Sequence, residues 1–134
     1  MSSENVELVE RFLDRVNRDE LDLALSDIDP DAVLDWSRSE APDGGIHRGR
    51  EAWSRWIHSR REGLSGARFD PEELIDLPPD RVVLVAYLRG VGRASGLEAE
   101  GLGASIIQVR DGLLTGITMF QSRAQALEAA GGFQ

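Results

Sequence analysis

Four β-rich segments in the second half of the chain limit the choice of folds more strongly than any other feature. Apolar and β-branched residues are dense there, as in the run VVLVAYLRGV at 82–91. The turn signals ASGL at 94–97 and RDGL at 110–113 are both typical of tight hairpins. The expected strands are residues 67–76, 81–93, 97–110 and 113–121.

The first half of the chain shows helical spacing instead. Apolar residues recur every three or four positions over residues 4–17, and Ser3 is the expected N-cap. Further elements are expected as a short helix capped by Asp19, a strand at 32–38, a helix at about 50–61, and a last helix starting at Ser122. Helices followed by hairpin-linked strands indicate a single α+β domain over residues 1–134, with the sheet wrapped over the helices.

Charge and composition exclude several classes of function. The net charge is −9, from 15 basic and 24 acidic residues, so nucleic acid is not an expected partner. Every basic residue is arginine, which excludes Schiff-base chemistry and a P-loop lysine. The chain has no cysteine and no apolar run long enough to span a bilayer. A cytoplasmic protein without membrane contact, metal or organic cofactor is therefore expected.

Four segments together resemble a known group of proteins. They are ERFLDRVNRDELD, DPDAVLDWSRSE, IHRGREAW and RDGLLTGITMFQSRAQALEAAG, in this order and spacing. The chain resembles the SnoaL-like branch of the NTF2-like (cystatin-like cone) superfamily. The resemblance implies a bent antiparallel sheet around three to four helices, with an apolar pocket at the wide end of the cone. It also implies a homodimer, and the superfamily contains both enzymes and non-catalytic binders.

Asp35 is the candidate catalytic residue. Strand alternation puts it on the face opposite Leu34 and Trp36, and Trp36 is expected to pack on the outer face of the sheet. The resemblance to ketosteroid isomerases places Asp35 where those enzymes carry a general base inside the cone. Phe12 and Ile106 stand where they carry oxyanion donors, so steroid-type isomerisation is not expected.

The pocket lining follows from the same alignment and from the expected register of one hairpin. A two-residue turn at Ser95-Gly96 would place Ile106 opposite Val85 on adjacent strands. Mostly apolar walls with a few polar anchors are typical of a small-molecule site. The expected lining is Phe12, Trp53, Trp56, Val85, Tyr87, Ile106, Gln108, Ile117, Met119 and Gln121.

Two functions remain open at this point. One is a small-molecule-binding protein whose apolar cone pocket takes a small apolar or polyketide-like molecule; as an enzyme, it would be a cofactor-free isomerase, cyclase or lyase with Asp35 as acid and base. The other is a non-catalytic binding or dimerisation module with a filled or vestigial pocket, in which Trp53 and Trp56 are core residues. A dyad of His47 and Asp35 would form only if the loop that carries His47 folds over the mouth of the cone.

Overall fold

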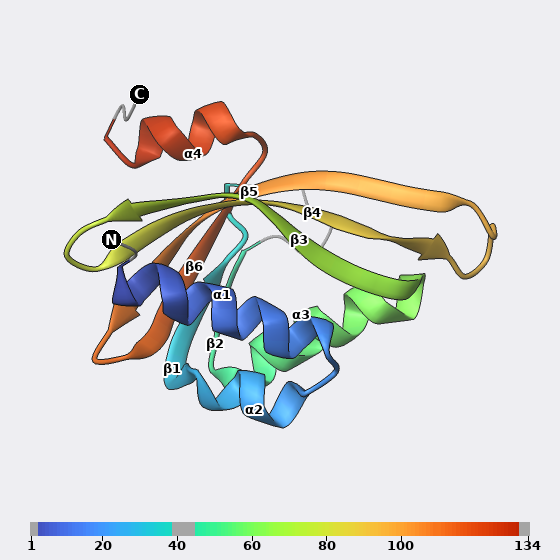
Figure 1. The fold of residues 1–134 in the computed structure, drawn as a ribbon, viewed down its shortest axis with the longest axis horizontal. Coiled ribbons are helices and arrows are strands. Elements are labelled where there is room, and N and C mark those ends of the chain that lie inside the picture. Colours follow the sequence, from blue (N-terminus) through green and yellow to red (C-terminus); the bar gives the residue numbers. More distant parts are fainter. Residues whose placement is uncertain (1–2, 39–44, 132–134) are drawn as a thin grey trace.

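The centre of the molecule is a curved six-stranded sheet with the order β2-β1-β6-β5-β4-β3 (Figure 1). The computed structural model describes residues 3–38 and 45–131. The strands are β1 (Ile28–Asp35), β2 (Ile46–Arg48), β3 (Leu64–Leu77), β4 (Arg81–Gly92), β5 (Glu98–Arg110) and β6 (Leu113–Phe120). The expected α+β class and the four strands of the second half are confirmed.

Helices cover both faces of this sheet (Figure 1). They are α1 (Glu4–Asn17), α2 (Leu21–Ser26), α3 (Arg50–Gly63) and α4 (Arg123–Ala129). We call the face under α1 and α3 the concave face, where Val82, Leu84, Ile107 and Ile117 are buried against Phe12 and Trp53. The other, the convex face, is covered by α4 and buries Val83, Val85, Ile106 and Phe120 with Leu127.

The helix ends form as the sequence predicts at two places. The Ser3 hydroxyl accepts a hydrogen bond from the Val6 N–H at 2.9 Å and starts α1. The Ser122 hydroxyl accepts from the Gln125 N–H at 3.2 Å, and the Gln125 side chain accepts from the Gln121 N–H at 3.0 Å. This reciprocal arrangement satisfies backbone donors at the start of α4.

The start of the second helix differs from the prediction. Asp19 does not cap it, because its φ of +64° places it in a left-handed turn between the helices. The helix begins at Leu21, after Glu20, whose side chain makes no capping hydrogen bond. The prediction gave both roles to Asp19, whereas in the structure Asp19 forms the turn and Glu20 holds the N-cap position.

The sheet is mixed, and this corrects the expectation that it is antiparallel throughout. β1 and β6 run parallel, with Leu34 beside Ile117 and Asp35 beside Thr118. The other four pairings are antiparallel. The parallel pair joins the first half of the chain to the end of the hairpin array, so the cone closes between elements far apart in sequence.

The β4–β5 hairpin has a longer loop than expected. Glu98 stands opposite Val91 and not opposite Arg93. The Gly92 N–H donates to the Leu97 carbonyl and the Gly96 N–H to the Gly92 carbonyl, both at 2.8 Å, so the loop takes in residues 93–97. The pairing slips by two residues, and an even slip leaves each side chain on the face that the alternation gave it.

The β5–β6 hairpin carries a bulge. Its tight turn is confirmed, because Asp111 and Gly112 have φ values of +53° and +76°, as a type I′ turn requires. The register then shifts by one residue between Gln108 and Val109, and Ile107 comes to lie opposite Ile117. Because of this one-residue shift, the β5 side chains that would otherwise share a face with a given β6 residue lie on the opposite face from it.

A buried carboxylate joins α1 to the start of β1. Asp27 is 4 % exposed and lies directly after α2. One of its oxygens is 2.9 Å from an Arg11 nitrogen, and the other is 3.0 Å from an Arg15 nitrogen. Its backbone carbonyl also accepts from the Leu114 N–H at 2.8 Å. This cluster fixes the helical layer against the start of β6.

A surface ion pair ties α4 to the far edge of the sheet. The Arg123 guanidinium makes two hydrogen bonds to the Glu73 carboxylate, at 2.6 and 3.1 Å. These bonds hold the pKa of the Glu73 carboxyl below its usual value. Glu73 lies on β3, so the pair holds the short helix over the convex face.

Candidate functional site

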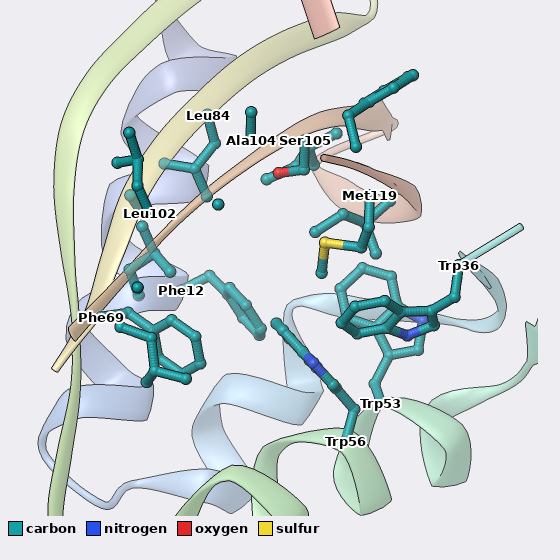
Figure 2. Close-up of a pocket in the computed structure, with 18 residues that line it drawn as sticks. Phe12, Trp36, Trp53, Trp56, Phe69, Leu84, Leu102, Ala104, Ser105 and Met119 are labelled. Atoms are coloured by element: carbon teal, nitrogen blue, oxygen red, sulfur yellow. The ribbon is translucent and has the colours of Figure 1, made fainter. Parts of the chain in front are cut away.

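An apolar cavity lies between α1, α3 and the concave face of the sheet (Figure 2). Its volume is about 260 Å³. Its walls come from α1 and α3, from the four strands β3 to β6, and from Trp36 just after β1, so the wrapping of the sheet creates it. The lining residues are Phe12, Leu13, Trp36, Trp53, Trp56, Phe69, Leu84, Ala86, Leu88, Gly101, Leu102, Gly103, Ala104, Ser105, Ile107, Ile117, Met119 and Phe120.

Burial divides the cavity into a closed end and an open end. Phe12 and Trp53 at the closed end are 4 % and 0 % exposed. At the other end Gly101 and Gly103 are exposed, and Leu102 between them is 49 % exposed. A ligand would therefore enter along this glycine-rich part of β5 and reach a closed aromatic floor.

The closed end is built from aromatic rings in contact. Phe12 and Trp53 meet edge to face, with ring centroids 6.1 Å apart. Trp56 contacts Trp36 at 6.0 Å and Phe69 at 5.6 Å. All three tryptophans of the chain line this one cavity, which makes their fluorescence a direct report on its contents.

Among the described lining residues, Ser105 alone has a side chain that carries oxygen. The ring nitrogens of Trp53 and Trp56 are buried and have no hydrogen-bond partner among the described residues, so these rings present carbon to the cavity. Within residues 3–38 and 45–131, no carboxylate, imidazole, phenol or guanidinium group lines the cavity. General acid–base chemistry needs such a group within hydrogen-bond reach of the substrate.

The structure gathers half of the expected pocket residues around this cavity. Phe12, Trp53, Trp56, Ile117 and Met119 line it. Val85 and Ile106 do not, because they pack on the convex face with α4. Tyr87, Gln108 and Gln121 are also outside the lining, and both glutamines are exposed. The error comes from the alignment, which placed Ile106 inward, whereas the bulged register puts Ile107 on the same face as Ile117.

Asp35 does not point into the cavity, and the expectation that it does is wrong. Leu34 and Trp36 take the concave face, so alternation turns Asp35 away with its partner Thr118. One carboxylate oxygen accepts hydrogen bonds from the Ser37 N–H at 2.8 Å and the Ser37 hydroxyl at 2.6 Å. Asp35 therefore shapes the turn after β1. The expected outward position of Trp36 is wrong for the same reason.

The histidines lie away from the cavity. His47 is on β2, where it pairs with Leu34, and it is not a lining residue. His58 is exposed on α3. Within residues 3–38 and 45–131 no three His, Cys, Asp or Glu side chains are grouped as a metal ion would require. None of the four helices described is long and apolar enough to cross a membrane.

These features first define a class of protein. A curved sheet wrapped around three helices, with a hollow apolar interior, is the NTF2-like or cystatin-like cone. More narrowly, the chain belongs to the family of SnoaL-like domains, whose model matches residues 9–117. No curated protein sequence matches the chain.

Solved structures share this fold at low sequence identity. An NTF2-like protein from Burkholderia pseudomallei is 18 % identical over 97 % of this chain and 99 % of that one, with a TM-score of 0.74. TerC, co-crystallised with polyporic acid, is 21 % identical over 96 % and 98 % of the two chains, with a TM-score of 0.74. RV0760c from Mycobacterium tuberculosis, in complex with estradiol-17beta-hemisuccinate, is 18 % identical over 91 % and 96 %, with a TM-score of 0.75.

Proposed function

We propose that this protein binds a small, flat, apolar molecule of about two fused rings. The observation that carries the proposal is the apolar cavity of about 260 Å³ with its aromatic floor. A closed apolar cavity of roughly 150 Å³ holds benzene, so this one has room for a second ring. Its apolar lining favours transfer of such a molecule from water by about 25 cal/mol per Å² buried.

The structural relatives support a small-molecule ligand. TerC was crystallised with polyporic acid and RV0760c with estradiol-17beta-hemisuccinate. A polyketide-like ligand would present a comparable flat, largely apolar surface. Of the two functions that the sequence left open, the small-molecule-binding protein with an apolar pocket is favoured, because the cavity is present, and its catalytic form loses support because Asp35 does not line the cavity. A homodimer and a cytoplasmic location stay predictions.

A titration with tetralin, a hydrocarbon of two fused rings, tests this proposal. We expect a saturable change in tryptophan fluorescence with one site per chain and a Kd below about 0.1 mM. Such a Kd requires only a modest binding free energy from each of the ten carbon atoms of tetralin. The unfolded chain in guanidinium chloride is the control and should not saturate. A folded chain that shows no saturation up to the solubility of tetralin would contradict the proposal.

The variant Asp35→Asn tests the position of the carboxylate. We expect the Kd for tetralin to stay within about twofold, because Asp35 lies on the other side of the strand from the cavity. Stability should fall by about 1 kcal/mol or less, since the asparagine oxygen can still accept from the Ser37 N–H. A rise of fivefold or more in the Kd would return Asp35 to the binding site.

A further inference from the structure

The hydroxyl of Ser105 is an isolated polar group in the apolar wall. Ser105 lies in the middle of β5, between Leu84 on β4 and Met119 on β6, and all three line the cavity (Figure 2). It is only 4 % exposed. In the described part of the chain its hydroxyl makes no hydrogen bond.

The Ser105 oxygen is not among the fully buried side-chain atoms without a partner in the described residues, so it is reached from the cavity. Moving such a group from water into apolar surroundings is costly unless a hydrogen bond replaces those it made to water. The neighbouring concave positions on β5, Gly103 and Ile107, carry no polar side chain. A ligand that fills the cavity would therefore cut this hydroxyl off from water, and the hydroxyl would need a hydrogen-bond partner on the ligand.

We propose that Ser105 is the specificity-determining contact of the cavity and selects a flat two-ring molecule that carries a ketone or hydroxyl oxygen. A serine hydroxyl both donates and accepts, so either oxygen can pair with it. The inference rests on the proposed binding function and adds the polar group of the ligand. The aromatic floor holds the rings, and the hydroxyl fixes which edge of them turns toward the sheet.

Calorimetric titration of a matched pair of ligands tests this selection. 1-Tetralone is tetralin with one added carbonyl oxygen, so the two compounds differ in the group that Ser105 would bind. We expect Ser105→Ala to weaken 1-tetralone binding by about 3- to 10-fold, the range for one neutral hydrogen bond, and to leave tetralin within about twofold. Thr118→Ala is the control, because it removes a hydroxyl from the convex face of the neighbouring strand.

The outcomes separate this inference from the proposed function. If tetralin binds and Ser105→Ala weakens both compounds equally, or neither, the selection by Ser105 is wrong and the binding function stands. If neither compound binds the wild-type chain, the proposed binding function and the selection by Ser105 are both contradicted. A thermal unfolding scan adds a second measurement: Ser105→Ala should melt at the same temperature or higher. A fall of more than about 5 °C would show that the hydroxyl already has a partner in the free protein and would overturn the inference.

Discussion

Replacing Gly103 with phenylalanine is expected to abolish tetralin binding and leave the chain folded. Gly103 lines the cavity on β5, opposite Ala86 on the concave face. A Cβ atom built at this position meets no other heavy atom within 4 Å, and its φ is not in the left-handed region. The new ring therefore has space to enter the open end of the cavity, where it takes the place of a ligand.

The expected loss of affinity is at least 30-fold, measured by calorimetry so that the added ring does not alter the signal. Stability should rise by about 1 kcal/mol, because a glycine within a strand is unfavourable and the ring buries apolar surface. Gln108→Phe is the matched control, since it adds the same ring to an exposed position of the same strand. Retained tetralin binding in the folded Gly103→Phe variant would show that tetralin binds elsewhere.

Local patterns were sufficient to predict most of the fold. Residues 4–17 are helical because the apolar period and the Ser3 cap agree, and the helix has those bounds. The turn at Asp111-Gly112 was predicted because both positions adopt positive φ, which this residue pair tolerates well. The parallel pairing of β1 with β6 was not predicted. It joins distant segments, and no local signal encodes it.

The candidate site was predicted only in part. The alternation of side chains along a strand divides them between two faces of the sheet, but it does not show which face lines the cavity. For Asp35 and Trp36 alternation was correct, but the choice of face came from the alignment and was reversed. On β5 and β6 the bulge after Gln108 changed which isoleucines share a face. Ser105 was missed because a lone serine in a strand carries no signal until its neighbours are known.

The other large effect is expected on stability, at the buried carboxylate of Asp27. Asp27 is 4 % exposed in the wild-type chain, and Arg11→Ala/Arg15→Ala removes both of the cations that pair with its carboxylate. Breaking a buried ion pair from one side typically costs about 3–5 kcal/mol. For a domain of this size, that loss lowers the melting temperature by about 10–20 °C. Urea unfolding and thermal scans measure both quantities.

A third substitution shows whether the charge or the lost arginine packing causes this effect. In the chain with both arginines replaced, Asp27→Asn removes the unpaired charge and keeps nearly the same shape. We expect it to recover about 1–3 kcal/mol, since a neutral amide is less costly to bury than a carboxylate. The same change in the wild-type chain should be destabilising, because it weakens two charge-assisted contacts. Opposite signs in the two backgrounds would identify electrostatic pairing as the cause, whereas the same sign in both would assign the loss to the packing of the arginine side chains along α1.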